Sequence, residues 1–471
     1  MSDPIVTTTA GAVRGRAGGT AHVFHGIPYA APPTGAARFA PPAPHAPWSG
    51  VRDATAPGPT APQPRRDFGA LDMSPYFGAG WVPGADYLTA DVWTPPNAHR
   101  NPVLVFVHGG GFVAGSARTP LYDGTAFARD GVVLVTLQYR LGIPGFLDVP
   151  GAPPNRGLLD VVAGLRWVRE NIAAFGGDPG TVTLAGQSAG ATIAAGVLAT
   201  PEAAGLFQRA IVQSGSGLGA FSPEQAARVT RAAADALGIA PADFAPDFAP
   251  DFAEVPDERL VEIAPELGGL DLRTATRFDP LVGLSPFSLV LDRQPAEAAT
   301  ADVALLVGTN AEEGNLYLAP QGELITSTAQ DVHDTAARVA ADPAALVARL
   351  RAEHPAATEG GLRSAILGDA LFRTGSRRLA DAHAARGRPT HRYEFAWRSP
   401  ALDGSLGAAH AVELPFAFDN LHVPALRGPH GLLGRPAPPA ELATRLHGAW
   451  VDFARTGNPG WAPSDPAHFT A

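Results

Sequence analysis

The sequence contains neither cysteine nor lysine. Without cysteine, the chain cannot form disulfide bonds, use a thiol nucleophile or bind a metal through cysteine ligands. All 35 basic residues are arginine, which excludes lysine Schiff bases, pyridoxal-phosphate anchoring, the P-loop and Ser-Lys mechanisms. A catalytic serine in this chain must therefore be activated by a histidine.

Long apolar segments and an excess of positive charge are also missing. No stretch approaches the ~18 consecutive apolar residues that a membrane-spanning helix needs, and the first residues lack the charged and apolar regions of a signal peptide. The formal net charge is -10 at pH 7, which argues against nucleic acids and anionic membranes as partners. We therefore expect a cytoplasmic, monomeric protein that binds neither.

The composition is that of a globular protein with a large core, because 45% of the 471 residues are hydrophobic and 17% are charged. No Gly/Ser-rich linker divides the chain, so we expect one domain over residues 1–471, with helical insertions around 221–300 and 320–390. Strand-like and helix-like segments alternate along the chain. This alternation predicts an α/β protein with a central, mainly parallel, twisted sheet that is covered by helices on both faces.

The expected strands are short apolar runs rich in β-branched residues, and the expected helices carry apolar residues at helical spacing. We expect strands at about residues 102–107, 132–137, 181–186, 210–212, 303–307 and 391–397. We expect helices at about residues 158–175, 189–198, 221–237, 255–264 and 441–454, and several helical segments over about residues 328–385.

Ser188 lies in Gly186–Gly190, which reads Gly-Gln-Ser-Ala-Gly and joins the strand at 181–186 to the helix at 189–198. In a G-x-S-x-G sequence the serine sits on a strained turn between a strand and a helix, which exposes its hydroxyl group. The two glycines are needed because the backbones of strand and helix crowd together there. We therefore predict that Ser188 is a nucleophile.

A serine hydroxyl needs a histidine to accept its proton and a carboxylate to orient that histidine. In doubly wound hydrolases the three residues follow in the order serine, acid, histidine. The strand at 303–307 leads into Gly308–Gly314, where either Glu312 or Glu313 can be the acid. The pattern alone does not decide between them.

His410 is the expected base. Nine histidines follow Glu313, and His410 lies in a loop after the strand at 391–397, where such a fold would carry its base. His447, inside the last helix, and His468, in the tail, are expected to face solvent.

The strand at 102–107 ends in His108–Phe112, which contains three glycines in a row. Backbone without side chains can turn its N–H groups toward a substrate carbonyl, so this loop fits an oxyanion hole, to which the N–H of Ala189 would add a donor. A flexible glycine turn is the alternative for the three glycines taken alone.

The chain resembles the type-B carboxylesterases, a family that includes the cholinesterases and bacterial p-nitrobenzyl esterases and has the α/β-hydrolase fold. The matching segments occur in order along nearly the whole chain. They are Phe24–Pro33, Arg38-Phe39, Val92–Pro95, Gly109–Phe112, Tyr139–Gly142, Gly157–Asp160, Phe175–Pro179, Gln213–Gly215 and the loop around His410. The resemblance implies that Glu313 is the acid and that Gly110 and Gly111 carry oxyanion donors.

Three departures from the family pattern bear on the site. Ala85–Tyr87 stands where relatives often carry Glu-Asp-Cys, so the family's disulfide cannot form. The glutamate that commonly pairs with the Arg38 position is missing, which leaves the partner of Arg38 open. Gln187 stands where many relatives have glutamate, and the loss of this carboxylate beside the nucleophile makes a cationic, choline-type ester a less favourable substrate.

Two further segments are open to interpretation. The stretch at 63–86 is rich in aromatic residues and predicts either a packed Ω-loop or one wall of a substrate gorge. Ala242–Phe252 carries a four-residue repeat, and its prolines predict an exposed insertion without a regular helix.

Together these features predict a serine carboxylester hydrolase that acts on uncharged short- to medium-chain esters through a covalent acyl-enzyme. No metal or organic cofactor is required. The predicted site consists of Ser188, Glu313 and His410, with the N–H groups of Gly110, Gly111 and Ala189 as the oxyanion hole. An amidase, a carbamate hydrolase or a thioester hydrolase with the same triad, and a non-catalytic binding protein with the same fold, are the alternatives.

Overall fold

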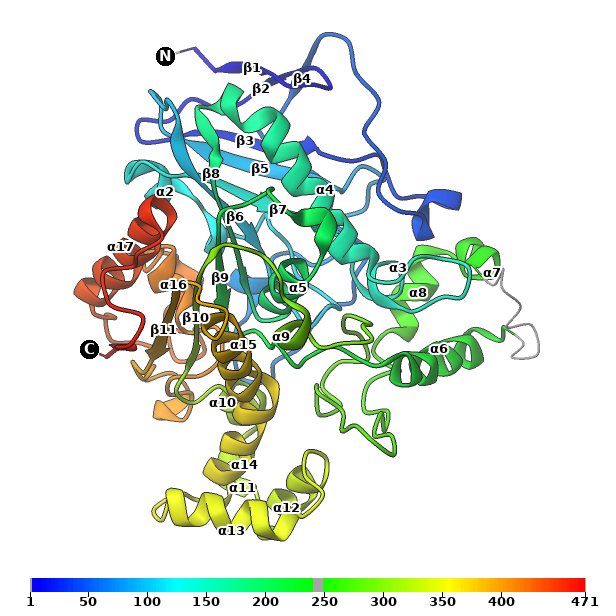
Figure 1. Cartoon of the computed structure of the whole chain (residues 1–471), viewed down its shortest axis with the longest axis vertical. Coiled ribbons are helices and arrows are strands. Elements are labelled where there is room, and N and C mark those ends of the chain that lie inside the picture. The colour runs from blue at the N-terminus through cyan, green and yellow to red at the C-terminus, as the bar shows by residue number, and fades with distance from the viewer. Residues whose placement is uncertain (1, 240–248, 471) are drawn as a thin grey trace.

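The structure, a computed structural model, describes residues 2–239 and 249–470. At its centre is a nine-stranded sheet with the strand order β12-β11-β10-β9-β8-β6-β7-β5-β3 (Figure 1). All neighbours from β12 to β7 are parallel, whereas β5 pairs antiparallel with both β7 and β3. The strands are β3 (His22–Pro28), β5 (Thr89–Thr94), β6 (Asn101–Val107), β7 (Val133–Leu137), β8 (Gly177–Gln187), β9 (Arg209–Gln213), β10 (Ala304–Asn310), β11 (Thr390–Phe395) and β12 (Ala467–Phe469). The predicted mainly parallel α/β sheet is confirmed.

Helices cover both faces of this sheet. Successive side chains of a strand point to opposite faces, and in β6 Val103 and Val105 join one core while Leu104 and Phe106 join the other. The first core includes α4 (Arg156–Asn171) and α5 (Ala189–Leu198), and the second includes α2 (Thr125–Arg129) and α17 (Ala440–Thr456). Burial on both faces explains why the central strands read as continuous apolar runs.

The remaining elements lie around the sheet. β1 (Ile5–Thr7), β2 (Ala12–Arg14) and β4 (Val51–Asp53) form a separate three-stranded sheet. The other helices are α1 (Ser74–Phe77), α3 (Gly142–Phe146), α6 (Pro223–Leu237), α7 (Ala249–Glu254), α8 (Asp257–Ile263), α9 (Pro295–Ala298), α10 (Asn315–Leu318), α11 (Glu323–Thr326), α12 (Ala329–Ala337), α13 (Pro343–Glu353), α14 (Glu359–Gly368), α15 (Thr374–Ala384) and α16 (Leu414–Ala417). In Figure 1, α11, α12 and α13 project below the sheet. The division of the chain into one domain with two helical insertions stays a prediction.

None of the helices within residues 2–239 and 249–470 combines the length and the apolar character needed to cross a membrane.

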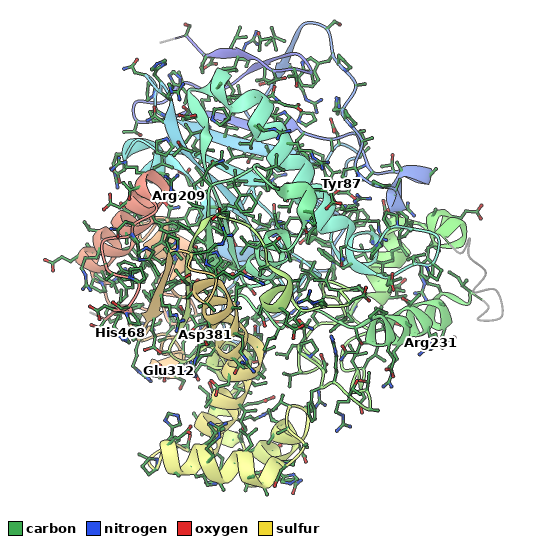
Figure 2. All side chains as sticks on the ribbon, viewed as in Figure 1. Tyr87, Arg209, Arg231, Glu312, Asp381 and His468 are labelled. Carbon is green, nitrogen blue, oxygen red and sulfur yellow. The ribbon has the colours of Figure 1, made fainter. Side chains whose placement is uncertain are left out.

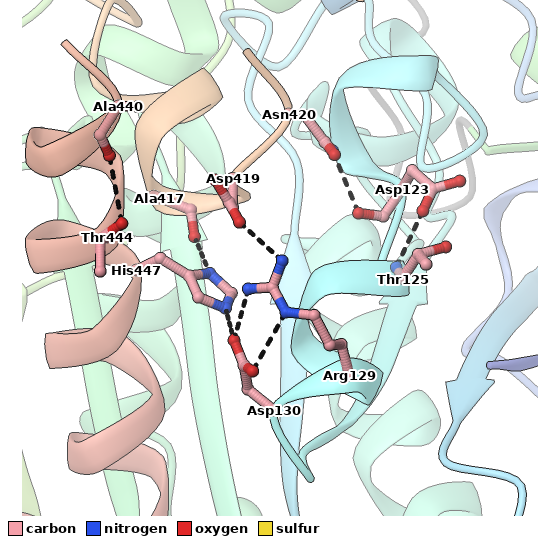
Figure 3. A network of polar contacts seen from close by, with 10 residues as sticks. All are labelled: Asp123, Thr125, Arg129, Asp130, Ala417, Asp419, Asn420, Ala440, Thr444 and His447. Atoms are coloured by element: carbon pink, nitrogen blue, oxygen red, sulfur yellow. Dashed lines mark hydrogen bonds and ion pairs between the residues drawn. The ribbon is translucent and has the colours of Figure 1, made fainter. Parts of the chain in front are cut away.

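His447 is buried in the structure, so the expectation that it faces solvent is wrong. It follows the buried Ala443 by one helical turn and therefore lies on the face of α17 that packs against the sheet. Its Nδ1 lies 2.9 Å from the Ala417 carbonyl oxygen and its Nε2 lies 3.1 Å from Asp130 Oδ2. Arg129 bonds to both Asp130 and Asp419, so this network ties α2 to the C-terminal helices (Figure 3). His468 is exposed, as expected (Figure 2).

The end of the proline repeat is packed rather than exposed. Residues 240–248 lie outside the described part of the chain, but Ala249–Glu254 forms the short helix α7, in which Pro250 occupies the first turn, where proline is tolerated. Phe252 is fully buried and meets the ring of Phe39 edge-on at 6.3 Å. The prediction of an exposed insertion without helix is therefore wrong for this end of the repeat.

The partner of Arg38 lies just after the repeat. Its Nε is 3.2 Å from Asp257 Oδ1, and its Nη1 donates to the carbonyl oxygens of Ala253 and Val255. A carboxylate from another part of the chain thus replaces the missing family glutamate.

Candidate active site

Ser188 occupies the tight turn between β8 and α5, with φ 57° and ψ -125°. A side chain at Gly186 would bring its Cβ to 2.3 Å from the carbonyl oxygen of Gly190, and one at Gly190 would lie 2.1 Å from the carbonyl oxygen of Val107. Only glycine fits at either position. The turn thus has the strained backbone and the crowding that the sequence predicts.

His410 and Glu313 are in direct contact. The Nδ1 of His410 lies 2.7 Å from Glu313 Oε2, and because a carboxylate only accepts, Nδ1 is the donor. The other carboxylate oxygen, Oε1, accepts from the Ser214 hydroxyl at 2.6 Å and from the Asn310 N–H at 2.7 Å. Both oxygens of this buried carboxylate are therefore bonded, which holds it in place.

Glu312 points elsewhere. Its Oε1 pairs with Arg398 and its Oε2 accepts from the Ala408 N–H at 2.9 Å. Of the two adjacent glutamates that the sequence pattern left open, only Glu313 contacts His410.

Aromatic side chains hold the His410 ring. Phe372 stacks on it with the ring centroids 4.3 Å apart and the planes 12° apart. Phe372 comes from a π-helical turn, Asp369–Arg373, between α14 and α15. Such a turn adds a residue to a helix and is frequent at functional sites.

Ser188 and His410 line the same cavity, but no hydrogen bond joins them. The Nε2 of His410 lies 3.3 Å from Gln187 Nε2, and Gln187 Oε1 accepts from the Tyr76 hydroxyl at 2.7 Å. Hydrogen bonds between a catalytic nucleophile and its base often tighten only when substrate binds. Gln187 thus lies against the predicted base, a contact that its place in the motif did not reveal.

Three backbone N–H groups are unused beside Ser188. Within the described residues, the N–H groups of Gly110, Gly111 and Ala189 donate to no protein acceptor, and all three residues line the cavity. The glycine loop is not a free turn, because the Ser285 hydroxyl donates to the Gly111 carbonyl oxygen at 2.6 Å. These groups are available to an oxyanion.

The cavity around Ser188 has a volume of about 80 Å³ and is mostly apolar. Tyr76 and Met73 of the stretch at 63–86 are buried and also line the cavity, so this stretch is both a packed loop and a wall. The other residues that line the cavity are Arg66, Phe68, Phe77, Phe112, Thr192, Leu281, Leu284, Ser285, Leu316, Tyr317, Leu371, Phe372 and Ala411. A larger cavity of about 470 Å³, lined by Arg277, Asp369 and others, contains none of the predicted site residues.

Glu413 is a buried carboxylate that the sequence analysis missed. Its Oε2 accepts from Asn310 Nδ2 at 2.6 Å, and the same asparagine donates its backbone N–H to Glu313. Burial, and then the charge of Glu313, raise the pKa of Glu413 to about 7. Its position three residues after His410 is the one signal in the sequence that could have indicated it.

Replacing Glu413 with glutamine is expected to stabilise the protein at pH 8 but not at pH 4.5. The raised pKa means that the folded state binds a proton between pH 4.5 and about 7 that the unfolded state releases, so this group lowers the free energy of unfolding as the pH rises through that window. Urea titrations should show a gain of ~1–3 kcal/mol at pH 8. The exposed Glu170→Gln change is the control, and a gain equal at both pH values would contradict the expectation.

No group of three or more histidine, aspartate or glutamate side chains in the described residues is arranged to hold a metal ion.

Comparisons with known proteins agree on one family. The model of the carboxylesterase family matches residues 2–468. Phenmedipham hydrolase of Pseudarthrobacter oxydans is 37% identical over 470 residues, which is 98% of this chain and 91% of that protein. Para-nitrobenzyl esterase of Bacillus subtilis is 35% identical over 469 residues, with the same coverage of 98% and 91%. A solved carboxylesterase structure from Geobacillus stearothermophilus is 35% identical and has a TM-score of 0.82. The match covers 99% of this chain and 96% of that chain.

Proposed function

This chain belongs to the carboxylesterase family and is a carboxylesterase with the α/β-hydrolase fold, and we propose that it cleaves uncharged short- to medium-chain esters through a covalent intermediate on Ser188. The observation that carries the proposal is the contact of Glu313 with His410, which lines the same cavity as Ser188 and the three residues with unused N–H groups. This set of groups supplies a nucleophile, a base, an orienting acid and oxyanion donors.

In the acylation step, the Nε2 of His410 accepts the proton of the Ser188 hydroxyl while Oγ attacks the ester carbonyl carbon. The carbonyl oxygen becomes an oxyanion and accepts hydrogen bonds from the N–H groups of Gly110, Gly111 and Ala189. When the tetrahedral intermediate collapses, the alcohol leaves with the proton from His410. The acyl group remains on Ser188.

In the deacylation step, His410 accepts a proton from water as the water attacks the acyl carbon, and the carboxylic acid leaves when Ser188 recovers its proton. Glu313 keeps Nδ1 protonated, so that Nε2 is free to accept, and its charge stabilises the imidazolium that forms in both steps.

The small, mostly apolar cavity favours short, uncharged acyl or alcohol groups near the reacting carbon. Within the described residues no carboxylate lines it, and the turn at Gly186–Gly190 carries the neutral Gln187. A cationic ester would therefore find no charge partner here.

Covalent labelling tests the proposal. A serine-directed organophosphate is expected to add once, to Ser188, and to stop the hydrolysis of p-nitrophenyl esters from acetate to octanoate. Peptide mass spectrometry locates the label. Labelling at another residue, or undiminished hydrolysis after full labelling, would move the reaction elsewhere. Faster cleavage of a matched anilide or carbamate than of the ester would overturn the substrate class.

A further inference from the structure

The geometry points to Arg66 as a specificity-determining residue that binds a carboxylate at the far end of the substrate, so that the enzyme also takes half-esters of dicarboxylic acids. This inference rests on the proposed function, because it concerns the cavity around Ser188. It extends the substrate class, since the reacting ester and its chain remain uncharged and only the remote end carries a charge.

Arg66 is held against the cavity by an aromatic stack. Its guanidinium carbon lies 5.7 Å from the centroid of the Phe68 ring, a cation–π distance. The Phe68 ring stacks in turn on Phe77, with centroids 5.3 Å apart and planes 23° apart. All three side chains line the cavity that contains Ser188. The stack therefore presents the guanidinium to a bound ester.

No anion neutralises this guanidinium within the described residues. Arg66 forms no ion pair there and donates no hydrogen bond, unlike Arg140, which pairs with Asp160 at 2.7 Å. Two aspartates of the same loop do not pair with it; Asp67 accepts from the Gly69 N–H and Asp72 accepts from the Ser74 N–H. The cation thus has unused hydrogen-bond donors beside the reactive serine.

The surroundings of Arg66 strengthen the interaction that its guanidinium can make with a bound anion. The residue is exposed as a whole, yet nearby atoms remove enough water to lower the pKa of the guanidinium, which stays protonated at neutral pH. The nearby hydroxyls of Tyr317 and Tyr76 do not supply a counter-charge, because burial raises the pKa of both. A partly desolvated cation without a partner gains from a charge-assisted hydrogen bond.

A carboxylate is the group that fits best. The planar fork of arginine matches the two oxygens of a carboxylate. The protein as a whole carries a net charge of -10 and would repel an anion at long range. Recognition of an anionic substrate therefore depends on a local cation, and among the charged side chains of the described residues only Arg66 lines this cavity besides the titratable His410.

The test compares matched esters. Monomethyl succinate, glutarate, adipate and suberate carry a remote carboxylate, and the corresponding dimethyl esters are their neutral counterparts. For the half-ester of best length, Arg66→Gln is expected to lower the ratio of its kcat/KM to that of the dimethyl ester by about tenfold or more, mainly through KM. Arg66→Lys should restore part of this ratio, because it keeps the charge but loses the fork.

Arg65→Gln is the matched control. Arg65 is the adjacent arginine and lines a neighbouring cavity but not the one with Ser188. It should leave the ratio unchanged. An unchanged ratio in Arg66→Gln, or an equal loss in Arg65→Gln, would overturn the inference. If the variants still hydrolyse the dimethyl esters, the proposed function stands even when the inference about Arg66 fails. If the unchanged protein does not hydrolyse the dimethyl esters, the proposed function itself is contradicted.

Discussion

The Ser188→Ala variant is expected to hydrolyse p-nitrophenyl acetate with a kcat about four to six orders of magnitude below that of the unchanged protein. Alanine cannot form the acyl-enzyme, so only substrate binding and the oxyanion donors would still accelerate attack by water. KM should change little, because the methyl side chain of alanine leaves the walls of the cavity in place. Circular dichroism spectra would verify that the fold is kept.

Combining this change with His410→Ala gives the sharper result. His410→Ala alone should cost about as much as Ser188→Ala, and the double variant should lose less than about tenfold more, because a nucleophile and its base act as one unit. The exposed His468→Ala change serves as the histidine control and should be silent. Additive losses, or near-normal turnover of His410→Ala, would show that another group accepts the serine proton.

Glu313→Gln is expected to lower kcat/KM by about three to four orders of magnitude. The amide keeps the shape of the side chain but loses the negative charge that stabilises the imidazolium. It also offers an N–H group where His410 Nδ1 needs an acceptor, which favours the wrong tautomer.

Glu312→Gln is the matched control for this change, since it alters the adjacent residue by the same atoms. Glu312 bonds to Arg398 and to the Ala408 N–H, on the outer side of the His410 loop. We expect a loss of less than about tenfold, through a small loosening of that loop. The measurement is kcat/KM of both variants with the same ester. A larger loss in Glu312→Gln than in Glu313→Gln would show that Glu312 is the acid that orients His410.

The parts of the fold that the sequence predicts are those set by local patterns. The strand, turn and helix around Ser188 follow from alternating apolar residues, two small residues and an alanine-rich helix that are contiguous in the chain. The choice between Glu312 and Glu313 is different, because adjacent residues at the end of β10 point in different directions. The family resemblance implies Glu313, and the packing of the His410 loop onto that strand end shows that Glu313 is the one that meets the histidine.

Contacts between segments that are distant in the chain could not be predicted from the sequence. Tyr76 and Gln187 are 111 residues apart, and their hydrogen bond depends on how the loop at 63–86 packs against the turn that carries Ser188. His447 lies on the buried stripe of α17, but its partner Asp130 is 317 residues away. A histidine in a mixed helix looks the same in sequence whether or not such a partner exists.

The order of the strands has a consequence for how the protein is made. From β8 to β12 the sheet adds its strands in the order in which the ribosome makes them. Each new strand can therefore pair with an edge that its predecessor has already formed, and none has to be inserted between existing neighbours. Ser188 follows β8, Glu313 follows β10 and His410 follows β11. The nucleophile is thus synthesised long before its base, and the growing chain can fold around a serine that gains its histidine only after β11 has been made.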